Sequence, residues 1–200
     1  FAAASEIPLI VIDAQRAGPS TGMPTKTEQS DLPAALFGNH GDNTKVLLSV
    51  SNVIDCFYAP HMARYLTEKL KVPVIILSDF LSANSYKVID KLKTVELDGN
   101  INELPDFVFE RFHLNRLPDS IEMVRDNQSM PGTPDGMRRV TGLNTDREGQ
   151  VNYFSKTNQR SHEVRNEKLH HVQRALKKPE IFGPEEGDVM VVGWGSTRGA

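Results

Sequence analysis

The first strong pattern along the chain is a run of aliphatic and β-branched residues, Leu9–Ile12, followed by Asp13. Pro8 precedes the run, and a segment rich in glycine and proline follows it, which is typical of a strand that leads into a long loop. Because polar residues do not alternate with apolar ones here, the run predicts a strand buried on both faces. Residues 45–50 and 72–77 repeat the strand signal.

An amphipathic helix of about 18 residues is expected between the second and third predicted strands. Ser51 or Asn52 can cap its N-terminus, and its solvent side carries Arg64, Glu68 and Lys71. Its apolar positions, which recur every fourth residue, are Ile54, Tyr58, Met62, Leu66 and Leu70. Strand, helix and strand form one βαβ unit of a parallel sheet, with a right-handed crossover.

Less regular patterns flank this unit. A short helix over 28–37 is expected to join the first two strands. Residues 95–160 are irregular and contain several prolines, so we place a domain boundary within them. Residues 161–178 then predict a helix, and residues 188–192 predict a strand that opens a second domain. The apolar side of that helix is formed by Val164, Leu169, Val172 and Leu176.

The charge balance excludes some partners. The chain has 23 Lys and Arg against 26 Asp and Glu, a net charge of −3, so composition gives no support for binding nucleic acid or an anionic membrane. No aliphatic run approaches the roughly 20 residues that a membrane-spanning helix needs. Cys56 is the only cysteine and cannot form a disulfide or a Cys cluster within the chain, which indicates an intracellular, cytoplasmic protein.

The segment after the first strand is the strongest candidate for chemistry. Between Asp13 and Gln29 it gathers Arg16, two glycines, two prolines and several hydroxyl side chains. Ligands bind at the carboxyl ends of strands in open α/β sheets, and a guanidinium can hold a carboxylate or phosphate by two hydrogen bonds. The pattern favours an anion pocket, although a solvated connection has the same composition. A Walker A loop is disfavoured because Ser20 and Thr25 stand where its two glycines belong.

Other motifs carry less information. His162, His170 and His171 do not have the i, i+4 spacing of a helical zinc site and predict a solvated helix face. There is no catalytic Ser-His-Asp order, and we assign no catalytic or metal-binding residue. Trp194, between two glycines, marks a tight turn that serves packing or a subunit contact.

Residues 15–32, which read QRAGPSTGMPTKTEQSDL, closely resemble the signature loop in the α subunit of the thiamine-diphosphate-dependent 2-oxoacid:ferredoxin oxidoreductases, especially the 2-oxoglutarate type. The resemblance continues over nearly all 200 residues. It is carried by residues 55–57, 77–79 with 83–85, 130–134, Arg165 with Lys168, and 193–197.

The resemblance implies an α/β fold, a parallel sheet flanked by helices of the pyrimidine-binding type. It places the C-terminal part of that domain at 1–95, an irregular linker region at 96–160, and the start of a transketolase C-terminal-like domain at 161–200. With Phe1 in place of Met and an end in mid-pattern at Ala200, the chain is expected to be a fragment of such a subunit.

The resemblance also implies cofactors and partners. Thiamine diphosphate is shared with a β subunit, and that partner, not this chain, holds Mg²⁺ and a 4Fe–4S cluster. A second α chain belongs to the assembled complex, with ferredoxin and coenzyme A as co-substrates. The implied reaction is oxidative decarboxylation of 2-oxoglutarate or a related 2-oxoacid to acyl-CoA and CO₂.

By the same resemblance, Arg16 binds the substrate's 1-carboxylate, and Ser20 and Thr21 line its pocket. Lys26, Thr27 and Glu28 either join that pocket or fix the loop, with Thr27 as the N-cap of the following helix.

The glutamate that activates the aminopyrimidine in this family has no counterpart here, so the chain is expected to be inactive alone. The alternative is a non-catalytic domain for subunit assembly with the same fold, and a phosphate-binding module is a third possibility.

Overall fold

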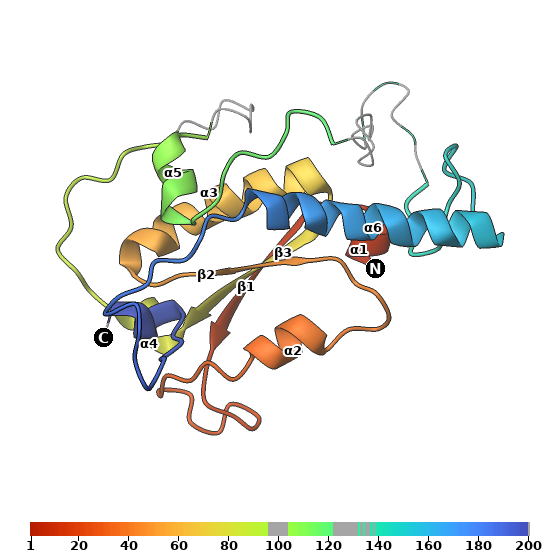
Figure 1. The fold of residues 1–200 in the computed structure, drawn as a ribbon. Coiled ribbons are helices and arrows are strands. Elements are labelled where there is room, and N and C mark those ends of the chain that lie inside the picture. Colours follow the sequence, from red (N-terminus) through yellow and green to blue (C-terminus); the bar gives the residue numbers. More distant parts are fainter. Residues whose placement is uncertain (96–103, 122–131, 133, 135–136, 138, 200) are drawn as a thin grey trace.

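The computed structural model describes residues 1–95, 104–121, 132, 134, 137 and 139–199. Within them, three parallel strands form one sheet flanked by helices (Figure 1). The strands are β1 (Leu9–Gln15), β2 (Val46–Ser49) and β3 (Pro73–Asp79), in the order β1-β3-β2. The predicted parallel α/β fold is confirmed, whereas the sequence motif at residues 130–134 lies largely outside the described residues.

The helices are α1 (Ala2–Ser5), α2 (Leu32–Phe37), α3 (Val53–Leu70), α4 (Phe80–Asn84), α5 (Asp106–Arg111) and α6 (Ser155–Ala175), with a 3-10 helix, η2 (Gly195–Gly199), near the C-terminus. None of the described helices combines the length and apolarity that a membrane crossing demands.

Helix α3 and the strands on either side of it form the predicted βαβ unit. The Asn52 side chain accepts hydrogen bonds from the backbone N–H groups of Ile54 and Asp55, both at 3.0 Å, which satisfies two donors that the helix leaves free. The expected apolar stripe is buried at Tyr58, Met62, Leu66 and Leu70. Because α3 covers β3 with this stripe, it supplies more of the hydrophobic core than any other described helix or strand.

Helix α5 was not predicted from the sequence, and it packs on the outer side of α3 (Figure 1). Phe109 meets Tyr65 edge to face, with ring centroids 4.9 Å apart, and Phe107 meets Tyr58 in the same way at 5.2 Å. Such pairs stabilise a core beyond the area that they bury. Two aromatic contacts therefore fix this six-residue helix, which is too short to be stable by itself.

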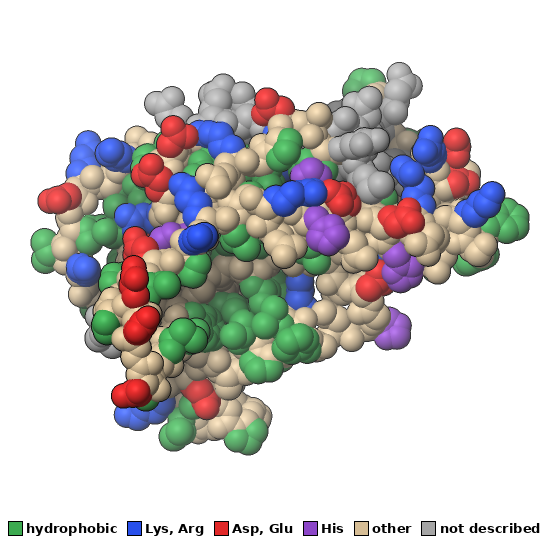
Figure 2. Space-filling model, viewed as in Figure 1, with side chains coloured by type: hydrophobic (Ala, Val, Ile, Leu, Met, Phe, Trp, Pro, Cys, Tyr) green, Lys and Arg blue, Asp and Glu red, His purple; other side chains and the backbone are tan. Residues whose placement is uncertain are grey.

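The prediction that β1 is buried on both faces is wrong. Leu9, Ile10 and Val11 are each at least 36% exposed, and Ile12 is 66% exposed. The reason is its position, because β1 is an edge strand that pairs only with β3 among the described strands. Figure 2 shows apolar side chains gathered over the sheet and α2, below α6. Exposed members of this apolar face include Leu36 and Phe37 of α2.

Helix α6 begins six residues earlier than the predicted position 161 and ends at Ala175. Its buried positions are Lys168 and Ala175, whereas Leu169, expected on the apolar side, is 37% exposed. Lys168 is only 1% exposed, and its Nζ donates a hydrogen bond of 2.6 Å to Glu6 Oε1. Arg165 contacts Asp42 at 2.8 Å. These ion pairs tie α6 to the residue that follows α1 and to the segment between α2 and β2.

The strand predicted over residues 188–192 does not form. Val189 to Val192 are largely exposed and run in an irregular path, because none of the described strands lies beside them to provide hydrogen bonds.

The buried Lys168–Glu6 pair predicts a large asymmetry between single and double substitutions. Glu6→Ala removes the carboxylate partner of a buried ammonium group and is expected to lower the free energy of unfolding by up to about 3–5 kcal/mol. Glu6→Leu combined with Lys168→Met removes both charges and is expected to recover most of that loss. Urea unfolding followed by circular dichroism measures both, and equal losses in the single and double variants would contradict the role given to this pair.

Candidate functional site

The carboxyl ends of β1 and β3 point to one corner of the molecule, where the loop after β1, α4 and η2 gather (Figure 1). The register explains this meeting, because Gln15 lies opposite Asp79 at the last position of each strand. Loops at this edge of a parallel sheet are the usual place for ligands. The candidate site is therefore built from the residues that follow Gln15 and Asp79.

The arginine loop, Arg16–Glu28, is an ordered turn structure. Ala17 is buried and bridges Met23, whose N–H donates to the Ala17 carbonyl at 3.3 Å. Glu28 closes the loop, since its Oε2 accepts a 2.9 Å hydrogen bond from the Gly18 N–H. Internal hydrogen bonds of this kind give the loop a fixed shape, which a merely solvated connection would lack.

The three substrate-binding residues expected from the sequence lie on this loop and all three are exposed. Ser20 and Thr21 form its tip, with φ angles of 51° and 55° in the left-handed region that non-glycine residues rarely adopt. The Arg16 guanidinium forms no hydrogen bond or ion pair with any residue that the structure describes. The loop thus presents an uncompensated cation and two hydroxyl groups to an incoming anion.

Lys26, Thr27 and Glu28 form the second group of loop residues named from the sequence. Lys26 donates its backbone N–H to the Met23 carbonyl at 3.1 Å. Thr27 is not the N-cap of the next helix, because α2 begins at Leu32 with Asp31 as its N-cap. Helix α2 is therefore shorter than the predicted 28–37. Pro33 in its first turn suits that start, since proline fits where backbone N–H groups have no helical partner.

Asp79 is the central buried carboxylate of this corner, 1% exposed. Its oxygens accept hydrogen bonds from the Ser82 N–H at 2.8 Å, from Gln29 Nε2 at 3.4 Å and from Ser196 Oγ. Burial raises the pKa of Asp79, but the hydrogen bonds from Ser196, Ser82 and Gln29 outweigh it and lower that pKa below its usual value. Asp79 thus remains ionised and joins β3, the arginine loop and the C-terminal turn.

Two buried oxygens near this carboxylate have no hydrogen-bond partner among the described residues. They are Oε1 of Gln15, a residue only 1% exposed, and Oγ of Ser82. The Gln15 amide nitrogen is already engaged, because it donates to the Ser78 carbonyl at 3.0 Å. Leaving such atoms unpaired is costly, so they indicate positions where a polar ligand can bind.

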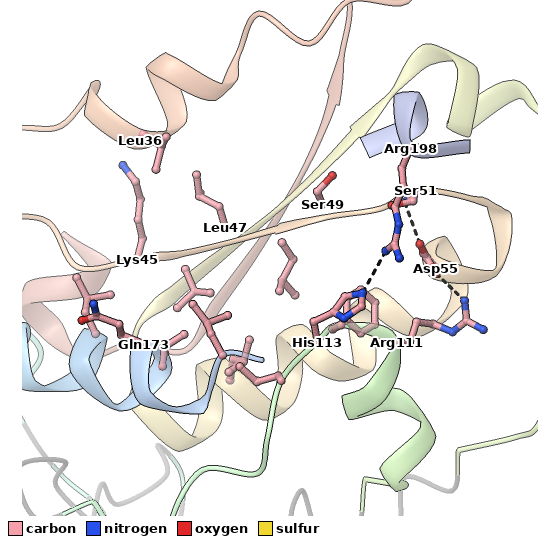
Figure 3. Close-up of a pocket in the computed structure, with 18 residues that line it drawn as sticks. Leu36, Lys45, Leu47, Ser49, Ser51, Asp55, Arg111, His113, Gln173 and Arg198 are labelled. Carbon is pink, nitrogen blue, oxygen red and sulfur yellow. Dashed lines mark hydrogen bonds and ion pairs between the residues drawn. The ribbon is translucent and has the colours of Figure 1, made fainter. Parts of the chain in front are cut away.

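A separate cavity of about 450 Å³ lies between β2, α6 and the segment after α5 (Figure 3). Its wall is mostly apolar. Lys45 stands at one end and Asp55, Arg111 and Arg198 stand at the other (Figure 3). Arg111 Nη1 contacts Asp55 at 2.7 Å, while Arg111 Nε has no partner among the described residues.

Sequence reasoning missed this cationic end of the cavity because its members come from four separate segments. The Nε2 atom of His113 lies 3.2 Å from Arg198 Nη1. Arg198 also pairs with Glu180 at 2.7 Å. The one local signal was Asp55, an acidic residue in the first turn of a helix, but that position is common in helices without any site.

No group of three or more metal-ligating side chains occurs among the described residues. On α6, His170 is exposed, whereas His162 and His171 are half-buried. His162 contacts Asp42, and His170 and His171 contact Glu167. Burial, followed by the nearby charges of Asp55 and Asp79, raises the pKa of the Cys56 thiol, which disfavours a reactive thiolate.

Asp79→Asn is predicted to destabilise the protein at pH 7 by about 1–3 kcal/mol, because hydrogen bonds to a charged acceptor are lost. Since the folded-state pKa of Asp79 is lowered, its stabilising effect is present above its unfolded pKa and is lost as the pH falls through the folded pKa. The difference between wild type and variant should therefore shrink by pH 3. Urea unfolding at the two pH values measures it.

Asp13→Asn is the matched control, because burial and then Asp31 raise the pKa of Asp13. Its ionised form opposes folding at neutral pH, so this variant is expected to keep or increase stability at pH 7. A pH-independent loss in Asp79→Asn would contradict the assigned charge of Asp79.

Comparisons with known proteins all point to one family. The family described as "Pyruvate flavodoxin/ferredoxin oxidoreductase, thiamine diP-bdg" matches residues 1–165. The chain is 31% identical over 98% of its length to 2-oxoglutarate oxidoreductase subunit KorA of Mycobacterium tuberculosis, covering 29% of that protein. It is 35% identical over 82% of its length to 2-oxoglutarate synthase subunit KorA of Methanothermobacter marburgensis, covering 41% of it.

Among solved structures, 2-oxoglutarate:ferredoxin oxidoreductase from Magnetococcus marinus, with 2-oxoglutarate, coenzyme A and succinyl-CoA bound, is similar with a TM-score of 0.73 and 35% identity. The match covers 99% of this chain and 34% of that one. The chain thus spans about a third of the length of these relatives. With the parallel sheet, the arginine loop at its carboxyl end and the match over residues 1–165, the chain belongs to the thiamine-diphosphate-binding family of the pyruvate flavodoxin/ferredoxin oxidoreductases.

Proposed function

We propose that this chain is part of the α subunit of a cytoplasmic 2-oxoacid:ferredoxin oxidoreductase. The reaction is the coenzyme A-dependent oxidative decarboxylation of 2-oxoglutarate, or a related 2-oxoacid, to acyl-CoA and CO₂ with reduction of ferredoxin. The observation that carries the proposal is the Arg16 cation, which has no counter-charge among the described residues and lies on an ordered loop at the carboxyl end of the sheet. The chain is also similar to subunits named for 2-oxoglutarate.

Arg16 is the proposed ligand of the substrate's 1-carboxylate. A guanidinium is planar and always charged, so it can hold a carboxylate by two parallel hydrogen bonds without exchanging protons with it. Ser20 and Thr21, beside it on the loop tip, are the proposed hydroxyl donors to the same substrate. Together they hold the 2-oxo carbon in a fixed orientation, which is how an enzyme reduces the entropic part of a reaction barrier.

The buried residues of this corner fit the aminopyrimidine of thiamine diphosphate. Gln15 Oε1 is an acceptor without a partner among the described residues, and Ser82 Oγ can donate or accept. A ring with an amino group and ring nitrogens supplies the complementary atoms, so we assign these two residues to hold it. When bound, the cofactor would supply the nucleophile and the electron sink that decarboxylation of a 2-oxoacid requires.

The proposed partners follow from the division of labour in such complexes. A β subunit shares the cofactor and holds Mg²⁺ and a 4Fe–4S cluster, and a second α chain completes the assembly. Residues 1–95 are assigned to the pyrimidine-binding domain, 96–160 to a linker region, and 161–200 to the start of a transketolase C-terminal-like domain. Support comes from the relatives, which are named as subunits of oxidoreductases.

A second candidate function, a non-catalytic assembly domain, is favoured by one observation. The aliphatic side chains of β1 are exposed, and the outer edge of β1 pairs with none of the described strands, as in a surface that meets another polypeptide. In this alternative the arginine loop docks a partner subunit. The two functions differ in what happens when Arg16 is removed.

Arg16→Ala in the assembled enzyme is predicted to raise the KM for 2-oxoglutarate by about 10- to 150-fold, corresponding to about 1.5–3 kcal/mol for a charge-assisted contact. Arg16→Lys, which keeps the charge and loses the planar fork, should fall between wild type and Arg16→Ala. Steady-state kinetics with varied 2-oxoacid measures the change.

Arg147→Ala removes an exposed arginine elsewhere in the chain and serves as the control, with KM unchanged. If Arg16→Ala instead weakens subunit assembly and leaves the kinetics of the remaining complex unaltered, the assembly function is correct and the enzymatic one is wrong.

The chain alone is predicted to give no turnover of 2-oxoglutarate, because the proposed cofactor site is shared with a second subunit. Adding thiamine diphosphate, Mg²⁺, coenzyme A and ferredoxin to the purified chain, with spectroscopic detection of ferredoxin reduction, measures this. Turnover by the chain without a β subunit would overturn the proposed sharing of the site.

A further inference from the structure

The C-terminal turn, Gly193–Thr197, rests on the same corner of the sheet as the arginine loop. The Trp194 carbonyl accepts a hydrogen bond of 3.0 Å from Gln29 Nε2, and Ser196 Oγ donates to the buried Asp79 carboxylate. Thr197 Oγ1 and the Trp194 backbone also hydrogen-bond each other, so the turn is rigid in itself. Two independent contacts thus fasten a rigid turn to the base of the loop.

The fit at Gly195 is so close that an added side chain would displace the Gln29 amide. A Cβ atom at this position would lie 2.4 Å from Gln29 Nε2 and 3.3 Å from Ser49 Oγ, and the backbone has a φ of +64°. Gly195 is also buried, unlike most of the C-terminal segment before it. The turn therefore packs directly against the Gln29 amide. A change in the position of the turn would move the Gln29 side chain, and a change at Gln29 would move the turn.

Gln29 connects this turn to the arginine loop. It follows Glu28, whose carboxylate closes the loop on Gly18, and its single amide nitrogen donates both to Asp79 and to Trp194. At the N-terminal end of the loop, Gln15 is fixed by its hydrogen bond to the Ser78 carbonyl. The N-terminal end is thus held by strand β3 alone, whereas the C-terminal end, at Gln29, needs the C-terminal turn as well.

We infer that Gln29 is a positioning residue for the arginine loop and that the C-terminal turn fixes the position of the Gln29 amide. With the turn seated, the Gln29 amide is fixed between Asp79 and Trp194, and the loop holds Arg16, Ser20 and Thr21 in the arrangement that binds the 2-oxoacid. Without the turn, the Gln29 amide nitrogen keeps, among its hydrogen bonds to described residues, the 3.4 Å contact to Asp79. The inference takes its substrate from the proposed function. The coupling between the C-terminal turn and the arginine loop does not depend on that function.

Gly195→Ala tests the coupling in the full 200-residue chain, without any reaction. The variant is expected to release the turn and to speed tryptic cleavage after Lys26, within the loop, by about fivefold, because cleavage follows local opening. Emission from Trp194, the only tryptophan in the chain, is expected to shift to longer wavelength as the turn becomes solvated.

Gly183→Ala is the matched control, because Gly183 also has a positive φ, +109°, but a Cβ there meets nothing within 4 Å. It carries the same type of backbone strain and should leave the cleavage rate at Lys26 unchanged. Equal cleavage rates in wild type and Gly195→Ala, or equal acceleration in both variants, would overturn the coupling.

Gln29→Met provides a second test that does not depend on a steric clash. In the assembled enzyme it is expected to raise the KM for 2-oxoglutarate about tenfold with kcat changed less than about twofold, since the loop loses its preferred arrangement and the chemistry is untouched. Gln159→Met, which removes an amide that donates to Glu163 on the exposed side of α6, is the control and should change neither constant.

The outcomes separate the two proposals. If Gly195→Ala loosens the loop while Arg16→Ala and Gln29→Met both leave KM unaltered, the coupling holds and the proposed substrate is wrong. If Arg16→Ala raises KM but Gln29→Met lowers kcat alone or has no effect, the substrate holds and the positioning role of Gln29 is overturned.

Discussion

The parallel pairing of β1 with β3 is the constraint on which the rest of the site depends. Its register sets Gln15 opposite Asp79, so a polar residue that precedes the arginine loop lies beside a carboxylate that precedes α4. Shifting the pairing by one residue would point the whole side-chain pattern of β1 to the other face of the sheet. The Asp79 carboxylate would then lose its place between Gln29 and Ser196, and the loop its fixed base. The geometry of the site is in this sense a consequence of strand pairing.

Local patterns were enough to predict the three strands, the βαβ unit and the loop with Arg16, because periodicity and turn residues act over a few positions. Burial of β1 was not predictable in the same way, since an aliphatic run has the same composition in a central strand and at an edge. The start of α6 was missed because residues 155–160 are polar and carry no apolar period. Lys168 was missed as a buried residue because its partner Glu6 belongs to the other end of the chain.

The site at the arginine loop differs from the cavity between β2 and α6 in how its charges are balanced. Around the cavity, Arg111 pairs with Asp55 and Arg198 with Glu180, so most of its cationic groups are already neutralised within the chain. Arg16 has no such counter-charge among the described residues, while the carboxylate nearest to it in the loop, Glu28, is engaged by the Gly18 N–H. A site that must attract an acid needs its charge to be available, and that criterion separates the two regions where size alone does not.

The contact between Gln29 and Trp194 joins residues that are 165 positions apart. During synthesis at about 5–20 residues per second, the glutamine therefore leaves the ribosome roughly 8–33 s before its partner. Long-range contacts of this kind form late, after the local elements are in place. The nascent chain thus carries a sheet and an arginine loop for many seconds before the loop is fastened, so the arrangement proposed to bind the acid is among the last features to mature.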